Sequence, residues 1–214
     1  MGLFPDLSVF CVADGMGGHE HGEIAAAVIV QKLPEIIHEI AGAKGIVDTD
    51  ADDAQMLWEE IAYRLHRFVR EEAHVRKVDD NMGATFAGLQ ILNSGRWITC
   101  HVGDARVYQI RQGQVVFMTR DHRPRPGIGV PKNAVLQAMG VGESIEPDIS
   151  SGECQSGDTF ILCSDGFWQD AQEGWEAELG ATSEIEQWLQ GAVDAGKSRG
   201  GADNSTAVLV RIVE

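Results

Sequence analysis

The chain has 214 residues, of which 43% are hydrophobic, so it is long enough to form one large domain with a substantial core. Its formal net charge of −16 argues against binding to nucleic acid, which requires a basic surface. The sequence has no apolar run long enough to span a membrane, and residues 1–6 lack the pattern of a signal peptide. We therefore expect a cytoplasmic protein without a membrane span.

The first part of the chain predicts one strand and two helices. The apolar run over residues 7–13 is typical of a buried strand. Residues 20–41 show helical spacing of apolar side chains, and Pro34 should kink this helix or split it in two. A capping pattern at Thr49–Asp52 starts a second helix that runs to about Val75. Its expected core-facing stripe consists of Leu57, Ile61, Leu65 and Phe68.

The middle of the chain predicts β structure followed by a long loop. Four short segments separated by turn signals indicate an antiparallel meander. These segments are residues 84–92, 96–102, 106–111 and 114–119. Residues 121–143 include three prolines and read as an irregular loop, and loops of this length in compact domains are usually functional or mobile.

The last part predicts a strand at residues 159–164, a helix that ends near Ala195 and a final strand at residues 206–213. Helices therefore come early and late, with a block of strands between them. This order favours an α+β fold with antiparallel sheets. No linker divides the chain, so we expect a single domain over residues 1–214.

Four aspartates stand at or near strand ends and form the main functional signal. Asp14-Gly15 and Asp165-Gly166 each follow an apolar run, Asp203-Asn204 precedes the last strand, and Asp104 lies between two strands. If these acids converge, they repel one another and raise each other's pKa unless cations are bound. An all-oxygen ligand set favours Mg²⁺ or Mn²⁺, and two such ions can activate a water and hold a phosphoryl oxygen.

Five short motifs in the same order resemble those of the PPM (type 2C) metal-dependent protein phosphatases in their bacterial form. The motifs are Val12–His19, Gly83–Thr85, Gly103–Arg106, Ser164–Gly166 and Asp203–Thr206. The resemblance implies a four-layer α-β-β-α sandwich of two antiparallel sheets. It also implies hydrolysis of phosphoserine or phosphothreonine on proteins by a water that bridges two metal ions, with residues 121–143 as a flap.

The resemblance also assigns roles to individual residues. Asp14 would bridge the two ions, the carbonyl of Gly15 would bind one of them, and Asp165 and Asp203 would hold the other. Asp104 would help to bind a third, weaker ion. We accordingly expect Asp14, Asp165 and Asp203 to be the catalytic set, Mn²⁺ or Mg²⁺ to be the cofactor, and a monomer to act on phosphoproteins made by a serine/threonine kinase.

One family motif has no counterpart in this sequence. The family carries Arg-x-x-Asn-Glu-Asp before its Asp-Gly motif, and none of the thirteen residues before Asp14 match it. That motif supplies the arginine that grips the substrate phosphate. Three explanations stand side by side: the chain is a fragment or starts at an internal methionine, another arginine such as Arg106 or Arg123 replaces it, or the protein is a weakened pseudophosphatase with a signalling role. A metal-dependent hydrolase of another phosphoester is a further alternative.

Overall fold

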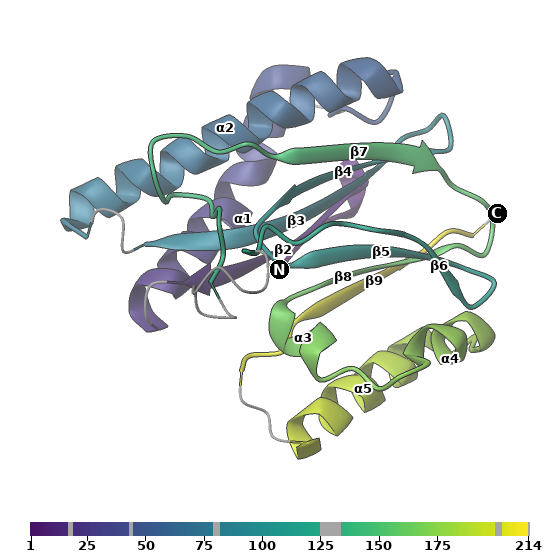
Figure 1. Ribbon diagram of the computed structural model, residues 1–214. Coiled ribbons are helices and arrows are strands. Elements are labelled where there is room, and N and C mark those ends of the chain that lie inside the picture. Colours follow the sequence, from purple (N-terminus) through teal and green to yellow (C-terminus); the bar gives the residue numbers. More distant parts are fainter. Residues whose placement is uncertain (17–18, 43–44, 79–81, 125–133, 200–202, 214) are drawn as a thin grey trace.

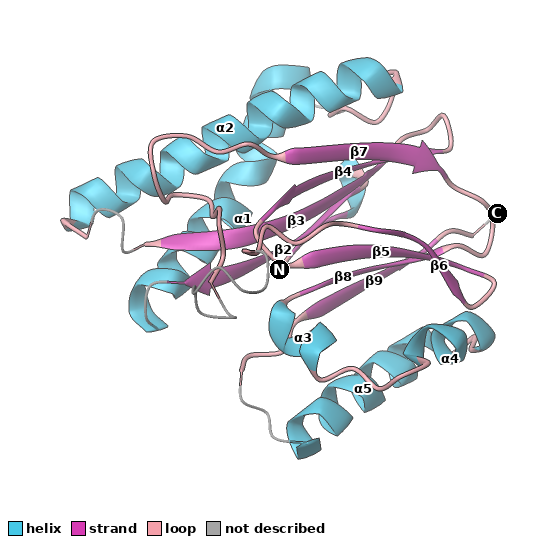
Figure 2. Ribbon diagram, viewed as in Figure 1, coloured by secondary structure: helices cyan, strands magenta, loops and turns pink. Residues whose placement is uncertain are grey.

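The computed structural model describes residues 1–16, 19–42, 45–78, 82–124, 134–199 and 203–213. It contains two antiparallel sheets that face each other, with helices on both outer sides (Figure 1). The first sheet has the order β1-β2-β3-β4-β7, and the second has the order β6-β5-β8-β9. Figure 2 shows the resulting layers, with strands inside and helices outside. The expected α+β sandwich of four layers is confirmed.

The elements follow one another along the chain as follows. The strands are β1 (Gly2–Phe4), β2 (Val9–Met16), β3 (Gly83–Ile91), β4 (Arg96–Val102), β5 (Arg106–Arg111), β6 (Gln114–Met118), β7 (Asp148–Glu153), β8 (Thr159–Cys163) and β9 (Ala207–Arg211). The helices are η1 (Pro5–Leu7, a 3-10 turn), α1 (His19–Ala41), α2 (Ala51–Arg76), α3 (Asp165–Gln169), α4 (Trp175–Ala181) and α5 (Ile185–Arg199). No helix within these described ranges is long and apolar enough to cross a membrane.

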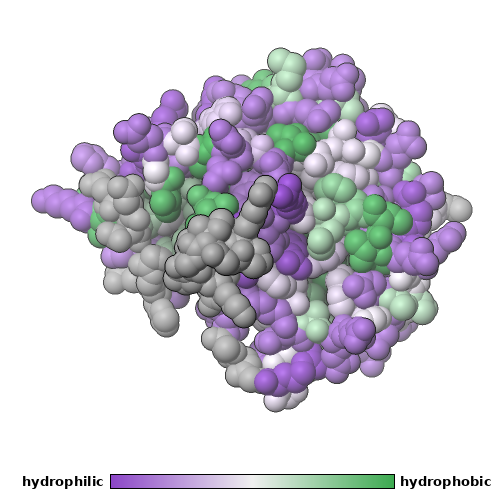
Figure 3. Space-filling view, in the orientation of Figure 1, coloured by the Kyte–Doolittle hydropathy of each residue, from purple (hydrophilic) through white to green (hydrophobic). Residues whose placement is uncertain are grey.

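Three apolar clusters hold the four layers together. One packs α1 and α2 against the first sheet and includes Trp58 and Phe86. The second fills the space between the sheets around Trp97 and Phe160. The third joins the second sheet to α3, α4 and α5 through residues such as Leu179. On the face shown in Figure 3, hydrophilic side chains predominate, with hydrophobic patches between them.

The two long helices were predicted in outline. α1 is one continuous helix that contains Pro34, so of the two expected effects of this proline, a kink or a split, the split is excluded. α2 begins where the capping pattern placed it, because the Asp50 side chain accepts hydrogen bonds from the backbone N–H groups of Asp52 and Asp53. Of its expected stripe, Ile61 and Leu65 are fully buried as predicted, whereas Leu57 and Phe68 are only partly buried; Trp58, outside the stripe, is also fully buried.

The strands differ more from expectation. The predicted four-strand meander is wrong, because β3 and β4 belong to the first sheet whereas β5 and β6 belong to the second. The chain changes sheets at Gly103, whose φ of 105° lies in the region that favours glycine. The sequence analysis also missed β1, β7, α3 and α4, which are short or lack a clear apolar period.

Candidate metal centre

Asp14 lies within β2 and not beyond its end, because the strand continues to Met16. It pairs in register with Thr85 of β3. The next residue, Gly15, packs closely against Gly22 of α1, where an added methyl group would lie 2.7 Å from the carbonyl carbon of Gly15. The contact leaves no room for a side chain at Gly22, and it holds the backbone of Gly15 against the helix.

Asp165 and Asp203 lie at the mouth of the second sheet and are held beside each other. The Ser164 hydroxyl accepts a hydrogen bond from the Thr206 N–H at 3.0 Å and lies 3.2 Å from the carbonyl oxygen of Asn204, to which it donates. A methyl group on Gly166 would lie 2.6 Å from that same carbonyl oxygen. The segment that carries Asp203 is therefore packed directly on the start of α3, which carries Asp165.

Asp104 reaches the same region from the turn at which the chain changes sheets. A methyl group on Gly103 would lie 2.7 Å from the Cβ of Thr85, the strand partner of Asp14. The backbone carbonyl of Asp104 accepts a hydrogen bond from the Trp168 indole N–H at 3.0 Å. These contacts place a carboxylate with a side chain only 5% exposed next to the β2–β3 pair.

The pKa values of Asp14 and Asp165 respond to the other acids of the group. Burial, followed by the charges of Asp165, Asp203 and Asp104, raises the pKa of Asp14 to about 7, and a hydrogen bond between the Asp14 and Asp165 carboxyl groups adds to the shift. Burial and the charges of Asp104 and Asp203 also raise the pKa of Asp165, although the Arg123 guanidinium opposes them. Carboxylates gathered in this way form an oxygen-rich site that favours hard cations.

Two arginines lie near this cluster, and they differ in how they are used. Arg106 donates two hydrogen bonds of 2.8 Å to Asp121 and one of 2.8 Å to the Tyr108 hydroxyl, and its guanidinium stacks 3.5 Å from the Trp168 ring centre. Burial alone would lower the pKa of Arg106, but these hydrogen bonds raise it above its usual value. Arg106 therefore joins β5 to the segment after β6, and most of its hydrogen-bond donors are already used within the protein.

Arg123 is directed at the acids themselves. Its Nε and Nη2 atoms lie 2.8 and 2.6 Å from Oδ2 of Asp104, and Nη2 also lies 3.3 Å from Oδ2 of Asp165. Asp165 accepts a further hydrogen bond of 2.7 Å from the side chain of Gln169. From the sequence, Arg123 was predicted only as a possible replacement for the arginine that binds the substrate phosphate. Its pairing with Asp104 and Asp165, two of the predicted metal ligands, was not predicted.

A second group with metal-ligand side chains, absent from the sequence analysis, consists of His101, His122 and Asp148, whose ligand atoms all lie within 4.8 Å of one another. The Gly103 N–H lies 3.2 Å from Nδ1 of His122 and donates to it. The proton of the neutral His122 ring is therefore on Nε2, which lies 3.3 Å from the Asp148 carboxylate. A hydrogen-bonded pair explains this arrangement better than a metal site does.

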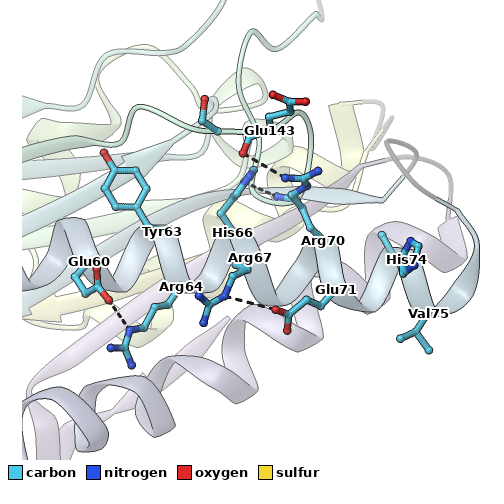
Figure 4. A pocket seen from close by; sticks show the side chains of 13 residues that line it. Glu60, Tyr63, Arg64, His66, Arg67, Arg70, Glu71, His74, Val75 and Glu143 are labelled. Atoms are coloured by element: carbon cyan, nitrogen blue, oxygen red, sulfur yellow. Dashed lines mark hydrogen bonds and ion pairs between the residues drawn. The ribbon is translucent and has the colours of Figure 1, made fainter.

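A groove of about 760 Å³ runs along α2, away from the four acids. Its basic side chains are already engaged by neighbours (Figure 4). Arg64 pairs with Glu60 at 2.6 Å, Arg67 with Glu71 at 3.5 Å, and Arg70 donates to the carbonyl of Glu143 at 3.3 Å. None of the four acids lines this groove and the charges of its arginines are paired, so we do not regard it as the functional site.

The expected flap over residues 121–143 is only partly described, because residues 125–133 lie outside the described ranges. Its two described ends are anchored to the first sheet and its exit turn. The His122 N–H donates to the carbonyl of Gly103 at 2.7 Å, and Met139 forms an antiparallel bridge with Ala84 of β3. Both anchors lie beside residues that flank the acids.

Comparison with known proteins identifies the family. The sequence model of the family described as Protein phosphatase 2C matches residues 4–195 of this chain. The chain belongs to the protein phosphatase 2C family.

Among the relatives of this phosphatase 2C chain, PhpP of Streptococcus pneumoniae is 29% identical over 97% of this chain and 87% of PhpP. The serine/threonine phosphatase PstP of Mycobacterium tuberculosis is 23% identical over 99% of this chain but only 42% of PstP, so the chain spans less than half the length of that relative.

The solved structures support the same fold. PppA of Pseudomonas aeruginosa superimposes with a TM-score of 0.79 at 28% identity, covering 97% of this chain and 87% of PppA. The catalytic domain of PstP in complex with two manganese ions gives 0.78 at 23% identity, covering 97% and 88%.

Proposed function

We propose that this chain is a metal-dependent protein phosphatase that hydrolyses phosphoserine and phosphothreonine. Membership of the phosphatase 2C family and the relatives PhpP and PstP support this activity. The observation that carries the proposal is the convergence of four carboxylates: burial, followed by the charges of Asp165, Asp203 and Asp104, raises the pKa of Asp14 to about 7. Carboxylates this close together repel one another, and bound cations would relieve the repulsion.

The donor set fits the ions that the family implies. We propose that Asp14, Asp165, Asp203 and the carbonyl of Gly15 hold two Mn²⁺ or Mg²⁺ ions, and that Asp104 contributes to a third. All of these donors are oxygens, as hard divalent cations require. The PstP catalytic domain, which shares the fold, binds two manganese ions. When bound, such ions supply an activated water and neutralise charge on a phosphoryl group.

The chain's own side chains suggest which arginine can meet the substrate phosphate. Arg106 is committed to Asp121 and Tyr108, whereas Arg123 borders the acids with a side chain that is 19% exposed. We propose Arg123 for this role, because a guanidinium suits bidentate contact with phosphate. We further propose a cytoplasmic monomer whose substrates are phosphoproteins made by a serine/threonine kinase, with the segment over residues 121–143 as a flap beside the site.

The proposal is tested by measuring phosphate release from p-nitrophenyl phosphate and from a phosphothreonine peptide, with and without Mn²⁺. We expect release that depends on Mn²⁺ and falls by about 100-fold or more in Asp165→Asn and in Asp203→Asn, because each change removes a charged ligand. The matched control is Asp194→Asn, whose side chain on α5 is 60% exposed and should not matter.

Activity that is indifferent to metal, or that survives both substitutions, would contradict the site. Mn²⁺ binding without turnover of either substrate would instead support the weakened pseudophosphatase. Turnover of small phosphoesters alone would point to the other hydrolase class.

A further inference from the structure

The guanidinium of Arg123 lies between the carboxylates of Asp104 and Asp165. Its Nη2 atom is within hydrogen-bond distance of both carboxylates, 2.6 Å from Asp104 and 3.3 Å from Asp165. Its Nε atom donates to the same oxygen of Asp104 at 2.8 Å. The guanidinium therefore already supplies the positive charge between these two acids, in the part of the cluster proposed for a third ion.

The guanidinium and a divalent cation exclude each other from this position. A cation bound to a carboxylate oxygen lies about 2.0 to 2.6 Å from it, the same region in which Nη2 lies. Two positive charges only a few ångströms apart in a half-buried site repel strongly. The side chains of Asp104 and Asp165 are only 5% and 18% exposed, so water screens this repulsion poorly.

The backbone next to Arg123 is held in place by contacts that do not involve the Arg123 side chain. His122 and Gly103 exchange hydrogen bonds, from the His122 N–H to the Gly103 carbonyl at 2.7 Å and from the Gly103 N–H to the His122 ring at 3.2 Å. Asp121 is held by Arg106. Among the described residues, the guanidinium of Arg123 contacts the two acids and lies over the Trp168 ring, 5.0 Å from the ring centre. A long side chain on a fixed backbone can leave the cluster without any change in the fold.

We propose that Arg123 is a tethered competitor for the cation held by Asp104 and Asp165, which stabilises the metal-free protein and must withdraw when that ion binds. This inference rests on the proposed function and adds a regulatory feature to the same site. Arg123 thereby weakens binding of this ion and raises the metal concentration that is needed to occupy the site. The withdrawn guanidinium remains beside the site, where it is available to a phosphate group.

The test compares Arg123→Gln with the wild-type chain by titration calorimetry with Mn²⁺ and by thermal unfolding in the presence of a chelator. We expect the weakest Mn²⁺ site to bind roughly 10-fold more tightly in Arg123→Gln, because one charge-assisted ion pair no longer competes. The metal-free variant should unfold at a lower temperature. A merely structural role would lower both stability and metal affinity, so tighter binding with lower stability is the distinguishing result.

Two further variants assign the effect to this pair of acids. Arg120→Gln removes the same charge three residues away from an exposed side chain, and it should change neither quantity. In the Asp104→Asn background, Arg123→Gln should no longer increase the affinity. Unchanged or weaker Mn²⁺ binding in Arg123→Gln, or an equal increase in Arg120→Gln, overturns the inference. If the wild-type chain binds no Mn²⁺ at all, the proposed function fails as well, so the two failures are distinguishable.

Discussion

His101 should make the stability of this protein fall in mildly acidic solution. The residue is fully buried between the sheets. Burial and the neighbouring His122 lower the pKa of His101 to about 4 from its usual 6.5, against the opposing influence of Asp148, Asp121 and the Ala105 backbone. Because the folded pKa lies below the unfolded one, the unfolded chain binds the extra proton first. The stabilisation is therefore complete above pH 6.5 and is lost as the pH falls toward 4.

The size of the effect follows from these two values. At pH 5.5 the unfolded chain is about nine-tenths protonated at His101, whereas the folded chain is almost unprotonated there. With about 1.36 kcal/mol for each pKa unit, His101 removes about 1.4 kcal/mol of unfolding free energy between pH 8 and pH 5.5. Since pH 5.5 is well above the folded pKa, this figure depends mainly on the unfolded value.

The assay is urea unfolding at pH 8 and at pH 5.5, with a chelator present, for the wild type and for His101→Leu. Leucine has nearly the same volume and cannot titrate, so the variant should lose about 1.4 kcal/mol less than the wild type between the two pH values. His38→Gln, which removes an exposed histidine on α1, is the control for the loss of a histidine as such. An identical pH dependence in His101→Leu and the wild type would refute this reasoning.

Two other substitutions test contacts that position the site and stabilise the second sheet. Gly22→Ala should reduce the Mn²⁺ affinity measured by calorimetry while the protein still folds. The added methyl group would lie 2.9 Å from the Gly15 carbonyl oxygen and must displace that proposed ligand. Unchanged affinity would argue against the role of Gly15. Asp158→Ala should lower the urea unfolding free energy by about 2 to 3 kcal/mol, since it leaves Arg111 and Gln109 without their buried acceptor; a loss below about 0.5 kcal/mol would show that this ion pair is not stabilising.

The sequence predicted those parts of the fold in which local pattern and burial agree. The apolar run before Asp165 became β8, with all five residues buried, and the apolar period after Asp50 became α2. β7 was missed because its sequence, Asp-Ile-Ser-Ser-Gly-Glu, has no apolar run and owes its place to pairing with β4. Which sheet a strand joins depends on contacts that are distant in sequence, so the division of the expected meander between two sheets was not predictable.

The same distinction applies to the site. Asp14, Asp104, Asp165 and Asp203 were recognisable because each stands in a short motif, and the structure brings them together. The pairing of Arg123 with two of them was not recognisable, because its contacts span 19 and 42 residues of sequence. No local pattern distinguishes this arginine from Arg106, which is equally close in sequence to conspicuous acids but is committed to Asp121.

The clustered acids also explain why the folded protein should be less stable without bound cations than with them. A group of buried carboxylates that raises the pKa of Asp14 to about 7 opposes folding, and only part of this repulsion is offset by Arg123 and Gln169. A cation that binds the folded chain and not the unfolded chain stabilises the fold in proportion to the logarithm of its concentration. Arg123 provides positive charge at one edge of the cluster, beside Asp104 and Asp165, and no comparable cation contacts Asp14 or Asp203 among the described residues. The repulsion between carboxylates that remains at Asp14 therefore favours the binding of a cation there. At Asp104, Arg123 already offsets part of the repulsion, so a cation gains less by binding.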